Sequence, residues 1–261
     1  MNTRSYTIRD TATMLRRNLR HVQRYPGMTA GVLMVPILML LLFRYAYGAT
    51  LAAGISSGGA GRYIDYLTPG IIVLAVGSTS VSTAVAVSMD MTEGIINRFR
   101  TMAIARVSVL TGHVLGSVIQ TVAAAVVVTG LAVALGFRSP AGPAAWLGAL
   151  ALVIAIALAI TWVSVALGLA AKSPEGASNT PMPLMFLPFL GSAFVPPQSM
   201  APWLRWFAEY QPFTPMIDTL RGLLLGTPTG NKAAIAAAWC AGLVLAGYLA
   251  ARMLFNRGAT R

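Results

Sequence analysis

Six long stretches of this chain contain no Asp, Glu, Lys or Arg, and each is about long enough to cross a lipid bilayer. A hydrocarbon core about 30 Å thick requires roughly 20 residues of α-helix. Only helices and closed barrels satisfy their own backbone groups in that core, and the absence of alternating apolar and polar residues selects helices. The sequence therefore predicts an all-α polytopic membrane protein with six transmembrane helices. The stretches are 25–43, 66–89, 107–137, 139–171, 176–204 and 233–251.

Composition supports the same class of protein. Hydrophobic residues make up 56% of the 261 residues and charged residues only 10%, whereas soluble proteins carry about 25% charged residues. A single membrane domain over residues 1–261 follows from this composition. More than twenty residues precede the first stretch, and no small-residue cleavage site follows it, so we do not expect a cleaved signal peptide.

The net charge of +12 does not indicate nucleic-acid binding, because the basic residues lie at the ends of the apolar stretches. The ends on the side of the two termini hold 13 Lys and Arg residues, and the opposite ends hold 6. The positive-inside rule then places both termini in the cytoplasm of a multi-pass protein of the cell membrane. The six residues on the opposite side are Arg44, Arg62, Arg138, Arg205, Arg221 and Lys232.

Two segments depart from simple spans. Apolar residues recur every three or four positions in 5–25 with arginines between them, which predicts an amphipathic helix in the membrane interface; a soluble cytoplasmic helix is the alternative. Prolines at 181, 183 and 188 interrupt the fifth stretch, and Trp203 and Trp206 follow. This pattern predicts a broken fifth span and a short amphipathic piece at headgroup level.

Several polar side chains fall inside the predicted spans. The hydroxyl-rich run 77–83 either packs helices closely or lines a polar pathway, and both interpretations stay open. Because polar or aromatic groups of the second and fifth spans are able to face a central pathway, the candidate pathway residues are Ser80, Thr83, Phe189 and Ser192. His113 is expected to form a hydrogen bond within the bundle, and Cys240 to act as a small apolar packing residue. No metal site is predicted.

The segment 90–106 combines charge with an apolar face. Asp90 and Glu93 come first and Arg98, Arg100 and Arg106 follow, an order that matches the dipole of a short helix. A solvated loop needs no apolar face, whereas a segment that binds a soluble partner does. The apolar residues of this segment are Ile95, Ile96, Phe99 and Met102.

Short motifs follow one another in a fixed order along nearly the whole chain. They are Arg24-Tyr25-Pro26, Tyr66-Leu67-Thr68-Pro69-Gly70, Gly94-Ile95-Ile96-Asn97-Arg98-Phe99-Arg100, Ser192-Ala193-Phe194-Val195-Pro196, Met200-Ala201-Pro202-Trp203-Leu204, Pro212-Phe213-Thr214-Pro215 and Leu220-Arg221-Gly222-Leu223-Leu224. In this order they resemble the ABC-2-type export permeases, and in particular their daunorubicin-resistance branch. Ala103 departs from the family, which usually has proline there, and this changes the expected local turn.

The resemblance implies one half of an exporter, paired with a second permease copy, identical or different, and with two separate ATPase subunits. Segment 90–106 would be the coupling helix, 5–25 the connecting helix beside it, and 188–215 an outer re-entrant pair that closes the exit. The residues implied in ATPase coupling are Asp90, Glu93, Gly94, Ile96, Arg98, Phe99 and Arg100, with Arg16, Arg17 and Arg20 on the connecting helix.

The chain lacks a phosphate-binding loop of the P-loop type. That motif requires Gly-Lys before Ser or Thr, but the two lysines are Lys172, after alanine, and Lys232, after asparagine. We therefore expect a transport subunit that is not an enzyme and binds no cofactor, with ATP and Mg²⁺ held by the partner ATPase. The predicted function is export of hydrophobic or amphiphilic compounds, either drugs, including antibiotics, or lipids.

Two other functions fit the sequence less well. An ion-coupled secondary transporter predicts carboxylates inside the membrane and an inverted repeat, but the six stretches contain no acids and the first three do not resemble the last three. A membrane enzyme needs a nucleophile with a base, and His113 is the lone candidate base, without an evident partner.

Overall fold

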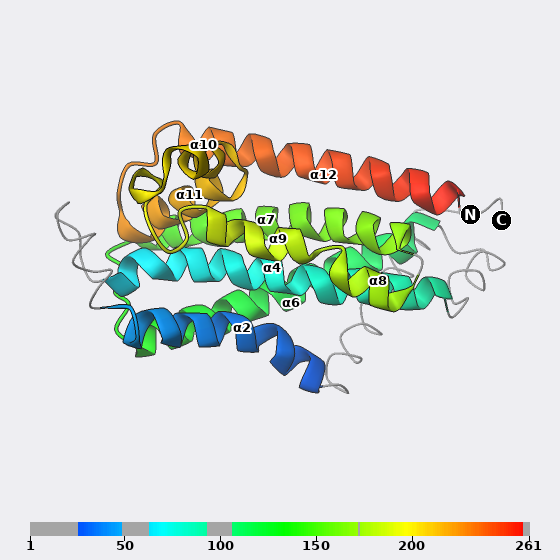
Figure 1. Cartoon of the computed structure of the whole chain (residues 1–261), viewed down its shortest axis with the longest axis horizontal. Helices are drawn as coiled ribbons and strands as arrows, with labels where there is room; N and C mark the ends of the chain where they lie inside the picture. Colours follow the sequence, from blue (N-terminus) through cyan, green and yellow to red (C-terminus); the bar gives the residue numbers. More distant parts are fainter. Residues whose placement is uncertain (1–25, 49–62, 93–105, 172, 258–261) are drawn as a thin grey trace.

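The structure is a computed structural model that describes residues 26–48, 63–92, 106–171 and 173–257. Every regular element in these ranges is a helix, and the long helices lie side by side as a bundle (Figure 1). The long helices are α2 (Pro26–Tyr45), α4 (Tyr63–Thr92), α6 (Arg106–Ala134), α7 (Pro143–Ala170) and α12 (Lys232–Arg257). The short ones are α8 (Pro174–Asn179), α9 (Met182–Phe186), η1 (Leu187–Leu190), η2 (Pro197–Ser199), α10 (Pro202–Tyr210) and α11 (Phe213–Leu225).

Helices α2, α4, α6 and α7 run in alternating directions, and α12 runs in the same direction as α7 because the short helices between them bring the chain back (Figure 1). The bundle therefore has two distinct ends. We call the end that holds Pro26 of α2 and Arg257 of α12 the terminal end, and the opposite one the distal end. Helices α10 and α11 and the start of α12 gather at the distal end. Helix α4 ends and α6 begins at the terminal end.

The prediction of a helical membrane protein is confirmed. Four helices, α4, α6, α7 and α12, are long and apolar enough to cross a membrane. In α2 the qualifying apolar stretch is shorter, Leu33–Tyr45, and the fifth predicted span is divided among short helices. Thus four of the six predicted spans are found as long apolar helices, and the total of six stays a prediction.

Prolines divide the fifth stretch as the sequence indicated. Pro181 is the N-cap of α9, Pro183 lies in its first turn, and Pro188 lies in η1. Proline lacks the backbone N–H that a continuous helix requires, and new elements begin beside these prolines, α9 at Met182 and η1 at Leu187. Further on, α10 exposes Trp203 by 75% and Trp206 by 67%, which fits the predicted amphipathic piece. The membrane re-entry of 188–215 stays a prediction.

Helix α4 is the central element of the bundle. Its most apolar window is 78% buried, and it contacts α2, α6, α7, α8, α9 and α11. Small residues permit this close packing: a Cβ on Gly168 of α7 would come within 2.5 Å of the carbonyl oxygen of Ala84. By contrast, the corresponding window of α12 is only 17% buried, so most of its surface faces outward.

Helix α4 also extends beyond the charge-free stretch 66–89. It includes Asp65 in its first turn and Asp90 near its last, and α6 begins at Arg106. Asp90, which was expected to begin the coupling helix 90–106, therefore belongs to the last turns of α4. The remaining coupling and connecting-helix residues lie outside the described residues of the chain: Arg16, Arg17, Arg20, Glu93, Gly94, Ile96, Arg98, Phe99 and Arg100.

Candidate functional sites at the two ends of the bundle

A row of hydroxyl groups joins α4 to α6 along the interior of the bundle. Thr79 Oγ1 lies 2.7 Å from Thr121 Oγ1, and Thr83 Oγ1 lies 2.6 Å from Ser117 Oγ. Ser117 also lies 3.3 Å from Thr161 Oγ1 of α7. The pairs match because the two helices run antiparallel, so that a step of four residues along α4 meets a step of four back along α6.

The predicted pathway residues of the second span take part in this helix packing. The Ser80 hydroxyl donates to Gly77 O at 2.6 Å, and the Thr83 hydroxyl donates to Thr79 O at 2.9 Å. Both residues are buried within the single chain. The Ser80 hydroxyl is therefore bonded within α4, whereas the Thr83 hydroxyl also contacts Ser117 of α6. A pathway role for Ser80 and Thr83 stays a prediction.

An acid–histidine pair joins α4 to α6 at the terminal end. His113 Nε2 lies 2.9 Å from Asp90 Oδ2, and the two side chains are only 7% and 14% exposed. The expected hydrogen bond of His113 within the bundle is confirmed, while the expectation that it has no evident partner is wrong. The Ser117 hydroxyl, one turn along α6, meets Thr83 and Thr161. The pair therefore holds the last turns of α4 to the N-terminal part of α6.

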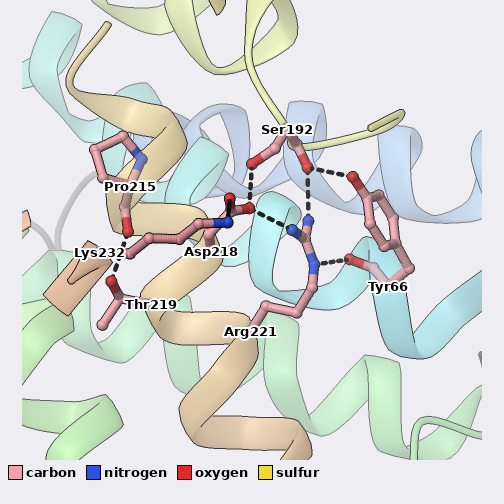
Figure 2. A network of polar contacts seen from close by, with 7 residues as sticks. All are labelled: Tyr66, Ser192, Pro215, Asp218, Thr219, Arg221 and Lys232. Atoms are coloured by element: carbon pink, nitrogen blue, oxygen red, sulfur yellow. Dashed lines mark hydrogen bonds and ion pairs between the residues drawn. The ribbon is translucent and has the colours of Figure 1, made fainter. Parts of the chain in front are cut away.

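A larger polar network lies at the distal end (Figure 2). Its centre is Asp218 of α11, which accepts hydrogen bonds from Ser192 Oγ at 2.6 Å, Arg221 Nη1 at 2.6 Å and Lys232 Nζ at 2.8 Å. These donors come from the segment before η2, from α11 itself and from the first residue of α12. One carboxylate therefore connects three segments of the chain.

Arg221 extends the network to α4. Its Nη2 donates to Ser192 O at 2.6 Å and its Nε donates to Tyr66 O at 3.3 Å. The guanidinium lies over the Tyr66 ring, 3.8 Å from the centroid, a favourable cation–π position, and the Tyr66 hydroxyl also donates to Ser192 O. Arg221 thus holds α4, α11 and the Ser192 segment in one arrangement.

Local sequence explains how these side chains meet. Asp218 and Arg221 are three residues apart on α11, so they share one helix face. Gly226 ends α11 in the left-handed conformation, with φ of 67°, and its N–H bonds to Gly222 O. After this turn the chain reverses and brings Lys232 back to Asp218. Gly70 of α4 provides room for the Ser192 segment, since a Cβ there would lie 2.5 Å from Ala193 O.

The predicted pathway residues of the fifth stretch lie in two different environments. Ser192 is 1% exposed and belongs to the distal network. Phe189 is partly buried and stacks on Phe194 at a centroid distance of 4.8 Å, and Phe194 in turn lies 4.2 Å from Phe43 of α2. The sequence analysis used Arg221 and Lys232 as topology charges, and Arg221 also as part of a family motif, but it assigned neither to a site and did not include Asp218. The spacing of three residues between Asp218 and Arg221 was the feature of the sequence that could have indicated an ion pair on one helix face.

Two cavities open near the distal end. One, of about 660 Å³, borders the distal network and includes Tyr66, Asp218, Arg221 and Lys232. The other, of about 830 Å³, lies between α6 and α7 and is lined almost entirely by apolar side chains. Within the described residues no group of three or more His, Cys, Asp or Glu side chains is arranged to hold a metal ion. Cys240 is buried with its thiol free.

Comparisons with known proteins identify relatives of the whole bundle. The model of the family described as ABC-2 type transporter matches residues 9–225. The daunorubicin resistance ABC transporter permease protein DrrB1 of Streptomyces coeruleorubidus is 29% identical over 243 residues, which cover 93% of this chain and 81% of the relative. The family match covers the helices of both polar sites up to the end of α11, together with the intervening segment 93–105.

Proposed function

This chain belongs to the ABC-2 type transporter family, and from that membership we propose that it is the permease of an ATP-driven exporter of hydrophobic or amphiphilic compounds. The family match over 9–225 carries the proposal. The name of the similar permease points to drug resistance, and a drug or a lipid are the two cargo classes that we consider. The chain supplies the membrane path, and two separate ATPase subunits supply the energy.

The terminal end is the proposed attachment point of the ATPase. Residues 93–105 form the coupling segment. The Asp90–His113 pair joins α4, which precedes this segment, to α6, which follows it. Any displacement of the coupling segment then moves α4 and α6 together. This orientation places both termini and the ATPase in the cytoplasm and the distal end outside.

Helix α4 provides the mechanical route from that end to the exit. It contacts α2, α6, α7 and α11, and its distal end is held by Arg221 through Tyr66. ATP binding is able to shift the bundle only if the inward-open and outward-open states differ in contact free energy. We propose that the distal network is one of the contacts that differ, because it fastens the segment 188–215 that would close the exit.

The outer surface of the bundle fits a pair of permeases. The apolar windows of α12 and α6 are only 17% and 39% buried, so these helices present apolar faces to lipid or to another protein. We propose that a second permease copy covers part of this surface and that the cargo passes between the two copies. Since the hydroxyl row is engaged in helix contacts, the path is expected to suit apolar cargo.

The proposal is tested by reconstituting the chain with its partner ATPase and measuring nucleotide hydrolysis. Glu93→Ala and Arg98→Ala are expected to abolish the stimulation of ATPase activity by the permease. The control is Arg205→Ala, which removes a charge from an exposed pair with Glu209 at the distal end and is expected to leave stimulation unchanged. Stable association with full stimulation in both coupling variants would contradict the assignment of 93–105.

One observation favours a second function. The Asp90–His113 pair is a buried acid–base pair at the end of two membrane helices, and buried ionisable groups of this kind occur in ion-coupled transporters. That function predicts cargo accumulation driven by a proton gradient in vesicles without any ATPase. Asp90→Asn would then abolish uptake in the absence of nucleotide.

A further inference from the structure

The apolar cavity of about 830 Å³ is a groove between α6 and α7 in the distal half of the bundle. Its walls are contributed by residues within 122–133 of α6 and 143–153 of α7. Its floor consists of Ile72 of α4 with Leu220 and Leu224 of α11, which are at most 3% exposed. The groove therefore has a closed floor and lies within two helices that are long and apolar enough to cross a membrane.

The groove is closed toward the terminal end and extends through one half of the membrane. Ser117 Oγ of α6 lies 3.3 Å from Thr161 Oγ1 of α7, so the two helices contact each other on the terminal side of the groove. At 1.5 Å of helix per residue, the wall 122–133 is about 16 Å long and the wall 143–153 about 15 Å long. Half of a hydrocarbon core about 30 Å thick is about 15 Å. The length of the groove therefore matches the depth of a single leaflet, whereas a transmembrane helix of a second copy would extend across both leaflets.

The lining of the groove favours a hydrocarbon ligand. Within the described residues the lining contains no charged side chain, and its one hydroxyl, that of Thr129, donates to Ala125 O at 2.7 Å. A polar group that entered the groove would lose its hydration without gaining hydrogen-bond partners. The rims of the two walls are exposed, Val126 by 62% and Leu147 by 68%, so the groove opens toward the surrounding membrane.

An exposed arginine with free hydrogen-bond donors lies at the distal mouth of the groove. Arg138 Nη1 donates to Val133 O at 3.2 Å and to Phe137 O at 3.1 Å, so the guanidinium lies at the end of α6. Asp65 Oδ1 accepts a hydrogen bond from the Arg138 backbone N–H, but no atom of the described residues accepts one from Nε or Nη2. The planar guanidinium complements the charge and geometry of a phosphate group. Trp146 lines the groove from the first turn of α7, and tryptophans concentrate at the level of lipid headgroups.

We propose that this groove binds an acyl chain of a phospholipid from the leaflet at the distal end, with the lipid phosphate held by Arg138. The chain passes Gly130 of α6, where a Cβ would meet nothing within 4 Å. The bound lipid fills the space between α6 and α7 and stabilises the distal half of the bundle. The inference goes beyond the proposed export function, because a bound membrane lipid requires neither ATP nor cargo.

The test measures lipid binding to the full chain, purified in detergent and stripped of lipid. Native mass spectrometry is used to titrate palmitoyl-oleoyl phosphatidylcholine, the diacylglycerol with the same two chains, and inorganic phosphate. Phosphatidylcholine has no net charge, so its binding does not report the overall charge of +12 of the protein. The diacylglycerol is expected to bind about fivefold more weakly than phosphatidylcholine, because it lacks the phosphate contact. Inorganic phosphate is expected not to compete with either lipid.

A matched pair of glycine variants tests whether the chain lies in the groove. Gly130→Phe should fold, because its ring enters open space and phenylalanine is more favourable than glycine in a helix. It should weaken phosphatidylcholine binding by about tenfold, the effect of displacing only two buried methylene groups of the chain. Gly242→Phe adds the same ring to open space on α12 and should leave binding unchanged. A phosphatidylcholine with a photoreactive group in the middle of one chain should label the groove walls in the wild-type protein and in Gly242→Phe, but not in Gly130→Phe.

A second pair of variants tests the mouth of the groove. Arg138→Gln should weaken phosphatidylcholine binding about fivefold and leave diacylglycerol binding unchanged. Arg205→Gln, which removes another exposed arginine at the distal end, should affect neither lipid.

Three results would contradict the proposal. Wild-type affinity for phosphatidylcholine in Gly130→Phe would overturn it. Dissociation of a permease dimer in this variant, with lipid binding unchanged, would assign the groove to a second copy instead. Equal binding of phosphatidylcholine and the diacylglycerol would overturn the role of Arg138.

Discussion

The two ends of α4 bury charge in different ways. At the terminal end, Asp90 pairs with His113, and the contact joins two helices that follow each other in the chain. At the distal end, Asp218 has three partners, and Arg221 adds contacts to Tyr66 and Ser192, which lie 155 and 29 residues away in sequence. The distal network therefore connects distant segments of the fold, whereas the terminal pair connects neighbours.

This difference suggests that the distal network mainly stabilises the fold, whereas the terminal pair mainly transmits movement. Removing a charged member of a buried network breaks several contacts between distant segments at once, so substitutions at the distal site should lower the free energy of unfolding most. A single pair between the two helices that flank the proposed coupling segment is easier to rearrange, so the terminal site should affect coupling more than folding. Substitutions at each end, made independently, test this separation.

The largest effect on stability is expected for Arg221→Ala at the distal end. The substitution removes the Arg221 donors to Asp218, Ser192 O and Tyr66 O in a site where Arg221 is only 14% exposed. Breaking a buried charge pair typically costs about 3–5 kcal/mol. Thermal unfolding in detergent measures the change. Arg205→Ala, in the exposed pair with Glu209, serves as control and should cost less than about 1 kcal/mol. An equal loss of stability in Arg221→Ala and Arg205→Ala would show that the distal network contributes no more than an exposed surface pair.

The next largest effect concerns close packing in the terminal half of the bundle. Gly168→Ala would place a Cβ 2.5 Å from Ala84 O, so α4 and α7 must separate. Overpacking of this kind costs about 1–3 kcal/mol. Gly242→Ala, in α12, meets nothing within 4 Å and should be neutral or slightly stabilising. Thermal unfolding of the two variants tests whether the stability of the bundle depends on the close approach of α4 and α7 at Gly168. Identical melting temperatures would show that it does not.

A smaller stability effect with a large functional effect is expected for Asp90→Asn. The amide keeps an acceptor for His113 but removes the charge, so the free energy of unfolding should fall by about 1 kcal/mol. Stimulation of the partner ATPase should be lost because the base of segment 93–105 is loosened. His113→Gln should produce the same phenotype. A stable variant with normal ATPase stimulation would show that the terminal pair does not belong to the coupling route.

The smallest effect is expected inside the hydroxyl row. A double-mutant cycle of Thr79→Val and Thr121→Val isolates the 2.7 Å contact between their Oγ1 atoms. Hydrogen bonds between membrane helices average about 0.6 kcal/mol in such cycles. The coupling energy is obtained from unfolding of the single and double variants in detergent. A value several times larger would indicate that the row, and not only the two ends, determines the arrangement of α4 and α6.

Much of the fold was predictable because the bilayer imposes simple rules on sequence. Charge-free runs located α4, α6, α7 and α12, and the prolines at 181, 183 and 188 located the interruptions of the fifth stretch. The exact ends of the helices were harder to predict from the sequence. Helix α4 includes Asp65 and Asp90 near its two ends. A charged residue is tolerated at such a position when another side chain pairs with it, as His113 pairs with Asp90.

The polar sites were harder to predict because they depend on which helices face each other. Asp90 and His113 meet only when α4 and α6 form an antiparallel hairpin in one register. The matched spacings of Thr79 and Thr83 with Ser117 and Thr121 would have indicated this register. Lys232 reaches Asp218 only after the chain reverses beyond Gly226, and neither residue alone indicates that contact.

The central claim is that this permease does not transport cargo unless a separate ATPase drives it through its terminal end. The most direct measurement is transport of a fluorescent apolar compound in vesicles that contain the chain with or without its partner ATPase. We predict accumulation against a gradient only when both proteins and hydrolysable ATP are present. Uphill transport by the chain without any nucleotide-hydrolysing partner would contradict this account.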